Sequence, residues 1–301
     1  MAGASEPSLL QQLLGDLSVS SFFEDCYQRR PVRRECGLEW KHPSADWDIA
    51  QRAIEAGGGD LLIAKGGRPW PGPAATSLDE LQRLSADGYT IAVRRADLYD
   101  APLARMSRAL ASEIHGKINL HVYFSRPVPG GFGWHFDPEE VFLFQSKGAK
   151  RFTLRENTQQ PWPRLESMNT ALSAQAESTP LVEHAIDPGS WLYIPSGWWH
   201  SATSLEESVT ISLGLLTPSA LDALELVREE LVGSARWRRR LPPLGGASGL
   251  SDEQRIALCR RHFAELADEI STKLTRDELP AKFFGATGWW TQLRPKKRRD
   301  P

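Results

Sequence analysis

A histidine and an aspartate placed two residues apart are the side chains of this sequence best suited to hold a metal ion. They are His135 and Asp137, within residues 133–141. In extended backbone, residues i and i+2 project from the same face, ~7 Å apart along the chain. One imidazole nitrogen and one carboxylate oxygen could therefore reach the same ion. Because such a tripeptide is common by chance, the prediction needs a third ligand from a neighbouring strand.

His200 is the candidate for that third ligand. It lies 65 residues after His135 and follows a turn at residues 195–197 that contains Pro and Gly. Two histidines and one carboxylate form the facial triad of non-haem Fe(II) oxygenases, which leaves coordination positions open for other ligands. Those positions suit a bidentate 2-oxo acid and O2. The alternative interpretation is a pair of core histidines that only make hydrogen bonds.

Short strands are predicted for the part of the chain that contains all three residues. Over residues 118–216, runs rich in aromatic and β-branched residues are separated by turns with Gly or Pro. The predicted strands are residues 119–124, 140–145, 151–154, 191–194 and 209–215. Many short strands with such turns are typical of a sandwich or a small barrel. We therefore expect a mainly β fold with helical flanks.

The residue pattern divides the chain into four parts. They are a flank of helices and strands (1–117), the β core (118–217), a helical region (218–290) and a basic tail (291–301). In the helical region, Ser251 and Gln254 form a capping-box pattern that opens a strong helix. One face of that helix is apolar and carries Ile256, Cys259, Phe263, Leu266, Ile270 and Leu274. We expect this face to pack on the β core or on a second subunit.

The composition is that of a globular chain rather than a disordered, collagenous or rod-like one. Of 301 residues, 41% are hydrophobic and 25% are charged. No apolar run approaches the roughly 18 residues of a membrane span, and no secretory signal is expected at the start. The cysteines Cys26, Cys36 and Cys259 are too few for a disulfide framework or a zinc cluster. We expect a cytoplasmic protein with reduced thiols.

The formal net charge of −2 comes from 36 basic and 38 acidic residues. So small a net charge gives no general attraction to nucleic acid, and we expect no nucleic-acid partner. Two basic clusters stand out, one at residues 236–240 and one at 294–299. We interpret them as a solvated helix end and a solvated tail. Contact with an acidic peptide or with RNA is the alternative.

Taken together, these motifs resemble the Jumonji-C (JmjC) branch of the cupin superfamily, and specifically the ribosomal oxygenases. The resemblance spans residues 10–216 and rests on the order and spacing of several strings. These are residues 22–31, 122–123, 135–142, 148–152 and 187–195, together with His200. The resemblance implies a double-stranded β-helix of the jelly-roll type, followed by a C-terminal helical region.

The resemblance also assigns residues to the binding of the co-substrate. In the family, a lysine fifteen residues after the first ligand binds the far carboxylate of 2-oxoglutarate, and here that position is Lys150. A tyrosine twelve residues before the first ligand corresponds to Tyr123. Where the family commonly has asparagine, this sequence has His121, which we expect in the pocket. Trp134 and residues 128–133 are expected to form one wall of the substrate entrance.

The activity implied by the resemblance is that of an Fe(II)/2-oxoglutarate-dependent dioxygenase. His135, Asp137 and His200 would hold Fe(II), and O2 would be consumed while 2-oxoglutarate becomes succinate and CO2. The expected reaction is hydroxylation of an unactivated C–H of a protein or peptide residue. A β-carbon is expected, with histidine as the first candidate and arginine as the second. A homodimer formed through the C-terminal helices is expected as well.

Three alternatives stay open at this point. The ribosomal oxygenases carry a winged-helix domain after their helical dimerisation region, and we expect no complete winged helix after Thr217. The first alternative is therefore a tailoring hydroxylase in the biosynthesis of a ribosomally synthesised peptide natural product (RiPP). The second is a JmjC N-methyl-lysine demethylase. The third is a non-catalytic, metal-binding cupin scaffold, but a scaffold would not need Lys150 to anchor a co-substrate.

Overall fold

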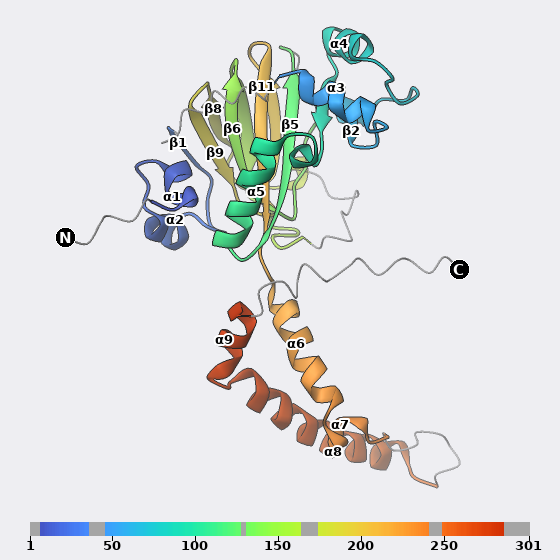
Figure 1. The fold of residues 1–301 in the computed structure, drawn as a ribbon. Coiled ribbons are helices and arrows are strands. Elements are labelled where there is room, and N and C mark those ends of the chain that lie inside the picture. Colours follow the sequence, from blue (N-terminus) through green and yellow to red (C-terminus); the bar gives the residue numbers. More distant parts are fainter. Residues whose placement is uncertain (1–6, 36–45, 128–130, 164–173, 241–248, 286–301) are drawn as a thin grey trace, which may run out of the picture. The chain divides into compact units, whose positions relative to one another are not determined.

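Figure 1 shows the computed structural model, in which the chain divides into two compact units. They are Met1–Leu216 and Thr217–Pro301. The structure describes residues 7–35, 46–127, 131–163, 174–240 and 249–285. The predicted basic tail (291–301), Cys36 and residues 128–130 of the predicted entrance wall lie outside these ranges. The two units are described separately.

The first unit is built on two antiparallel sheets, one of eight strands and one of three. The large sheet has the order β1 (Val32–Glu35), β9 (Ser190–Ile194), β6 (Glu140–Lys147), β11 (Ser208–Leu216), β5 (Lys117–Ser125), β4 (Thr90–Val93), β2 (Leu61–Lys65) and β3 (Arg68–Pro69). The small sheet has the order β10 (Trp199–Ser204), β7 (Lys150–Arg155) and β8 (Val182–Ile186). Long-range pairs such as β5 with β11 close the fold across distant parts of the chain.

The two faces of the large sheet contact different neighbours. Along β6, Phe142 and Phe144 belong to the core that the sheet shares with the helices. Val141 and Leu143, which alternate with them, belong to a second core shared with β7 and β8 of the small sheet. This alternation is the two-residue period of a strand with both faces buried. The result is the mainly β, jelly-roll-like core that the sequence predicted, with its interior between the two sheets.

Helices cover the outer face of the large sheet and contribute to its main core. They are α1 (Leu9–Leu14), α2 (Val19–Asp25), α3 (Asp48–Glu55), α4 (Leu78–Ala86) and α5 (Ala101–Glu113), with short 3-10 turns at Ala96–Leu98 and Ala174–Ala176. Four of the α-helices begin after a side chain that accepts a hydrogen bond from the first turn: Ser8, Ser18, Ser77 and Asp100. These caps satisfy backbone N–H groups that a helix start leaves free.

Four strands were not predicted from the sequence: β1, β3, β8 and β10. Strand β3 has only two residues, β1 and β10 have few apolar residues, and β8 is largely exposed. In β10 the polar Ser201 and Thr203 alternate with residues that face the interior. The predicted boundary at residue 117 also falls inside one sheet, because β4 of the flank pairs with β5 of the core.

The second unit consists of helices. They are α6 (Ala220–Val232), α7 (Ala235–Arg238), α8 (Asp252–Leu274) and α9 (Glu278–Gly285). The predicted capping box is present at Ser251 and Gln254. Of the apolar face predicted on α8, Ile270 packs on a small core formed around Val227 and Leu231, while Ile256 and Phe263 are exposed. None of the described helices is long and apolar enough to cross a membrane.

Candidate metal centre and active site

Backbone pairing brings the two predicted histidine ligands together. His135 and His200 form an isolated antiparallel bridge. The His135 N–H donates to the carbonyl oxygen of His200 (3.1 Å), and the His200 N–H donates to that of His135 (2.8 Å). Residues paired in this way project from the same face of the sheet. The two imidazole rings therefore lie side by side, with their centroids 4.1 Å apart.

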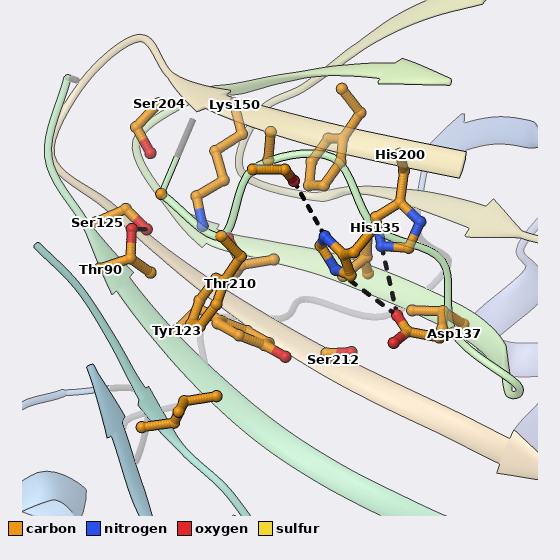
Figure 2. A pocket seen from close by; sticks show the side chains of 18 residues that line it. Thr90, Tyr123, Ser125, His135, Asp137, Lys150, His200, Ser204, Thr210 and Ser212 are labelled. Carbon is orange, nitrogen blue, oxygen red and sulfur yellow. Dashed lines mark hydrogen bonds and ion pairs between the residues drawn. The ribbon is translucent and has the colours of Figure 1, made fainter. Parts of the chain in front are cut away.

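Asp137 completes the group. The N–H of Gly197 donates to the carbonyl oxygen of Asp137 (2.8 Å), which fixes the turn before His200 against the segment after His135. The Oδ2 atom of Asp137 lies 3.3 Å from Nε2 of His200 and 3.9 Å from Nε2 of His135. One ligand atom from each residue lies within 4.8 Å of the others. Figure 2 shows the three side chains converging from two segments of the chain.

Hydrogen bonds to the backbone fix which imidazole nitrogens are free. Nδ1 of His135 lies 3.1 Å from the carbonyl oxygen of Gly133, and Nδ1 of His200 lies 3.0 Å from that of Trp198. A carbonyl oxygen only accepts, so each Nδ1 carries a proton, and in the neutral ring Nε2 is then the nitrogen whose lone pair can bind a metal. Both lone pairs are on the side of Asp137. Two neutral imidazoles and a carboxylate are the donor set that suits Fe(II), so the residues present fit this ion.

The electrostatics favour the protonation states that a cation requires. Burial alone would raise the pKa of Asp137, but contact with His200 and the nearby charge of His135 hold it well below its ordinary value. Burial, followed by the proximity of His200, lowers the pKa of His135. At neutral pH the site therefore presents an ionised carboxylate beside a neutral imidazole, ready to bind a metal without prior loss of a proton.

Two glycines allow the chain to approach these ligands closely. Gly133 has a φ of +70°, and a β-carbon on it would come within 3.0 Å of the Cα of Gly67. Gly197 has a φ of +80°, and a β-carbon there would lie 2.3 Å from the carbonyl oxygen of Pro161. Any other residue would be strained at both positions and would collide with backbone at the second. The turns that aim both histidines thus depend on glycine.

The metal candidates lie at one end of a cavity of about 320 Å³ between the two sheets. An apolar wall is formed by Val141, Leu143, Phe152 and Ala202. Hydroxyl side chains also line the cavity, and we call them the hydroxyl wall: Thr90, Tyr123, Ser125, Ser204, Thr210 and Ser212. Lys150 enters the cavity on the side opposite the metal candidates (Figure 2). The space suits a small polar ligand held between a metal ion and a cation.

Lys150 is the most unusual charged group of this cavity. Lys150 is only 5% exposed, and its Nζ lies 5.8 Å from the centroid of the Tyr123 ring. In the part of the chain that the structure describes, this Nζ has neither a hydrogen bond nor an ion pair, and burial lowers the pKa of Lys150 to about 7. A buried cation without a partner is costly, so a ligand carboxylate in the cavity would stabilise it.

Tyr123 lies where the sequence placed it, but His121 and Trp134 do not line the cavity. The Tyr123 ring contacts Phe132 and faces Lys150, and burial raises the pKa of its hydroxyl, which stays protonated. Nδ1 of His121 instead accepts a hydrogen bond from the Arg95 N–H (3.3 Å). The indole of Trp134 packs with Phe136 and Trp199 in a separate cluster. Local packing thus directs both side chains away from this cavity, and a contact of either one with the substrate stays a prediction.

The hydroxyl wall of the cavity was not predicted from the sequence. A signal for it was present along β11, where Ser208, Thr210 and Ser212 alternate with the apolar residues of the main core. A strand that buries both faces and carries hydroxyl groups on one of them indicates a polar interior. Thr210 Oγ1 donates to Gln145 Oε1 (2.9 Å), so part of the wall is held by its own hydrogen bonds.

The role of Glu177, a buried carboxylate that supports the strand of His200, was not predicted from the sequence either. Glu177 accepts hydrogen bonds from the Thr158 hydroxyl (2.6 Å), the Gln159 amide (2.9 Å) and the Trp199 indole N–H (3.2 Å). Burial would raise its pKa, but these hydrogen bonds lower it to about 2. Trp199 packs edge-on against Phe136, with the ring centroids 4.7 Å apart. Trp199, next to His200, and Phe136, next to His135, are thereby held in contact with each other beside the metal ligands.

Comparison with known proteins connects this geometry to a family. Residues 97–223 match the JmjC domain. The chain is 24% identical over 241 residues to the ribosomal protein uL16 3-hydroxylase of Escherichia coli (strain K12), a match that covers 75% of this chain and 61% of that protein. It is 30% identical over 163 residues to the bifunctional lysine-specific demethylase and histidyl-hydroxylase NO66 of Drosophila persimilis, covering 52% and 23%.

Solved structures agree with this assignment of the fold. The structure of YcfD, a ribosomal oxygenase from Escherichia coli, aligns with a TM-score of 0.56 at 22% identity, covering 90% of this chain and 70% of YcfD. The YcfD complex with cobalt and succinic acid aligns with a TM-score of 0.55 at 21% identity, with the same coverage. The predicted JmjC fold and the likeness to ribosomal oxygenases are confirmed. The chain spans about three fifths of the uL16 hydroxylase and under a quarter of NO66.

Proposed function

We propose that this chain, whose residues 97–223 match the JmjC domain, is an Fe(II)/2-oxoglutarate-dependent oxygenase that hydroxylates a residue of a protein or peptide. One observation carries the proposal: three metal-ligand candidates and a buried, unpaired lysine face each other across a single cavity. The names of the relatives support it, since both include a hydroxylase activity. The cobalt and succinic acid bound by YcfD support the choice of cofactor and co-substrate.

The metal ligands of the proposed enzyme are His135, Asp137 and His200. Fe(II) together with 2-oxoglutarate and O2 supplies the oxidising chemistry, with succinate and CO2 as co-products. The protein fixes the positions of the three ligand atoms through the backbone pairing of the two histidines. Three protein ligands leave the remaining positions to the co-substrate and O2.

Lys150 and the hydroxyl wall orient the co-substrate. The ammonium group of Lys150 pairs with the carboxylate that is remote from the metal, and the Tyr123 hydroxyl lies in the same cavity. Such a charge-assisted contact is strong in a buried site and also compensates the cation. The apolar side chains of Val141, Leu143 and Phe152 line the same cavity and limit the access of water to it. A dicarboxylate is thereby held at two defined ends.

The substrate proposed for this site is a protein or peptide residue hydroxylated at its β-carbon, with histidine first and arginine second. The name histidyl-hydroxylase in one relative and ribosomal protein hydroxylase in the other support this choice. Lysine demethylation is the second candidate, because the NO66 name includes it. A RiPP precursor peptide in place of a ribosomal protein is the alternative substrate for the same hydroxylation.

Mass spectrometry of candidate substrates distinguishes these reactions. The Fe(II)-loaded protein would be incubated with 2-oxoglutarate in air, with ribosomal proteins, methyl-lysine peptides or a library of histidine- and arginine-containing peptides. Gain of one oxygen atom, with succinate formed in equal amount, is the expected result. Loss of a methyl group would select the demethylase. His135→Ala should abolish both products, and turnover that survives this change would contradict the assigned site.

We also propose that the protein is a homodimer formed through the second unit. Three large apolar side chains of α6 support this: Leu221 is 68% exposed, Leu224 is 42% exposed and Val232 is 59% exposed. They recur at intervals of three and eight residues on one side of the helix, a spacing that suits helix–helix packing. Light scattering after size-exclusion chromatography should give twice the chain mass, and Leu221→Glu should give the monomer. A monomeric wild-type protein would refute this.

A further inference from the structure

The cations of the second unit fall into two groups with different surroundings. The first group is paired with carboxylates of the same unit. Its contacts are Arg228 with Glu225, Arg255 with Asp252, and Lys273, Arg276 and Lys282 with Glu230. The contacts with Glu230 lower the pKa of that carboxyl, first through the hydrogen bond from Lys282. These cations therefore have a role within the fold.

The second group consists of six arginines that have no such role. They are Arg236, Arg238, Arg239, Arg240, Arg260 and Arg261, and all six are exposed. Within the described residues, none of them has a carboxylate at ion-pair distance. Arg236 and Arg238 only make long contacts to the backbone carbonyl oxygens of Glu265 (3.5 Å) and Ser234 (3.4 Å). We call this group the arginine surface.

Contacts between the short helix α7 and helix α8 determine where the residues of the arginine surface lie. Trp237 packs on the small core near Ile270, so its neighbours Arg236 and Arg238 are directed to solvent. The Ser234 hydroxyl donates to Glu269 (3.2 Å), and Arg236 reaches the backbone at Glu265. A step of two residues forward, from Ser234 to Arg236, therefore moves the contact four residues back along α8, from Glu269 to Glu265.

Continuing in that direction, Arg238, Arg239 and Arg240 extend toward the part of α8 that carries Arg260 and Arg261. Figure 1 shows α7 lying alongside α8 in this unit. Arg236, Arg238, Arg239 and Arg240 follow one another in the chain, and the contact of Arg236 with Glu265 places this segment one helical turn from Arg261. No ion pair within the described residues compensates these charges, so an external polyanion would be attracted to them.

The chemistry of these side chains favours phosphates as that polyanion. A guanidinium group is planar and always charged, and it binds phosphate oxygens in a bidentate manner. One turn from Arg260, the ring of Phe263 is 52% exposed and offers a face on which a base could stack. Exposed aromatic rings among arginines are typical of surfaces that bind single-stranded nucleic acid, because bases stack on the rings. The carboxylates of an acidic peptide would pair with the arginines but would not stack on the ring.

From this arrangement we propose that the second unit binds single-stranded RNA through the arginine surface. The contact is to the phosphodiester backbone, with stacking on Phe263, and it does not read a base sequence. Since the net charge of the whole chain is −2, the attraction is local to this surface. The proposal differs from the expectation, based on net charge alone, that nucleic acid is not a partner. The proposal does not depend on the oxygenase activity of the first unit.

Fluorescence anisotropy with the full chain and a labelled oligouridine tests the proposal. Each neutralised phosphate contributes about 0.7 to the salt slope for a single strand. If four phosphates are contacted, affinity should fall roughly 50-fold between about 50 and 200 mM salt. The triple variant Arg238→Gln, Arg239→Gln, Arg240→Gln should bind at least about tenfold more weakly and lower that slope by about 2. Phe263→Ala should weaken binding about fivefold or more.

A matched variant controls for charge alone. Arg228→Gln, Arg276→Gln, Lys282→Gln removes the same number of positive charges from the paired group and should leave RNA binding within about twofold, because those cations contact no phosphate. Circular dichroism would verify that each variant is folded. An absence of RNA binding by the wild type at low salt overturns the proposal, and so does an equal loss in both triple variants. Tighter binding of polyglutamate than of the oligouridine would replace RNA by an acidic peptide.

Discussion

The two ends of the cavity are prepared for their ligands in opposite ways. At the metal end, His135, Asp137 and His200 already contact one another, and backbone hydrogen bonds hold both histidines in position. At the other end, Lys150 is buried without a partner in the described chain, and its pKa is lowered to about 7. One end is assembled by the protein before binding. The other is completed only by a ligand that carries a negative charge.

This difference has an energetic consequence. Preassembly at the metal end means that little reorganisation opposes metal binding. The unpaired lysine, by contrast, makes the ligand-free protein less stable, and the binding of a carboxylate is favoured because it pairs this buried cation. The two ends should therefore be separable by mutation: a change at one end should affect metal binding and a change at the other co-substrate binding.

The largest effect is expected when the metal end is broken. His200→Ala removes a ligand atom and one half of the histidine pair, so metal affinity should fall by more than the roughly 100-fold that loss of a supporting residue can cost. Hydroxylation should be abolished. Titration with Co(II) followed by visible absorption would measure the affinity. His184→Gln is the matched control, because His184 lies on β8 and does not line the cavity, and a comparable loss there would contradict the assignment.

Breaking the lysine end should separate the two binding events. Lys150→Met should weaken 2-oxoglutarate binding by roughly 10- to 100-fold, the value of a charge-assisted contact, and leave Co(II) affinity unchanged. Without ligand, the variant should melt higher, by about 2–4 °C for each kcal/mol of relieved burial. Lys147→Met, which changes an exposed lysine nearby, should do neither. A lower melting temperature in ligand-free Lys150→Met would show that the buried cation is already compensated.

The pH dependence sharpens the same comparison. Burial lowers the pKa of Lys150 from its ordinary value of 10.5 to about 7, so the folded, ligand-free protein loses this proton before the unfolded chain does. The unfolded state therefore binds more protons between pH 7 and 10.5, and the destabilisation caused by this group is relieved as pH rises through that window. Affinity for 2-oxoglutarate should fall above about pH 7, by up to about tenfold per unit.

Lys150→Arg isolates this effect, because a guanidinium stays charged over the whole range. Calorimetric titration from pH 6.5 to 9 should give a falling affinity for the wild type and a nearly constant one for the variant. Equal slopes in both proteins would assign the pH dependence to another group.

The smallest of the expected effects concerns the support behind the metal ligands. Glu177→Gln keeps the shape of the side chain but removes the charge that Thr158, Gln159 and Trp199 contact. Metal affinity should fall by about tenfold, the lower end of the range for supporting residues, and the free energy of unfolding by about 1–3 kcal/mol. Urea unfolding and Co(II) titration measure the two quantities. Glu183→Gln, at an exposed carboxylate on β8, is the control.

The sequence was informative at the metal end for a physical reason. A ligand pair two residues apart in a strand has to face one way, and a histidine after a Pro–Gly turn marks a second chain segment that returns to it. The relevant geometry is therefore local, apart from the single pairing of His135 with His200. The strand periods likewise predicted β5, β6, β7, β9 and β11, which form most of the walls.

What could not be predicted depends on packing between distant segments. Trp134 stands beside a metal ligand in the chain, but it turns away to pack with Phe136 and Trp199. Glu177 lies in an irregular segment without any period, and its role follows only from the approach of Trp199. Strand β10 gives a weak strand signal because His200 and Ser204 on its cavity face are polar, as are Ser201 and Thr203 on its other face.

The most direct test of the account is an anaerobic titration of the Fe(II)-loaded protein with 2-oxoglutarate, followed by visible absorption. The account predicts a charge-transfer band in the wild type, no band in His200→Ala, and in Lys150→Met the same band reached only at a roughly 10- to 100-fold higher concentration of 2-oxoglutarate. A wild-type protein that binds Fe(II) but forms no band would contradict the account. So would a Lys150→Met variant that saturates at the wild-type concentration.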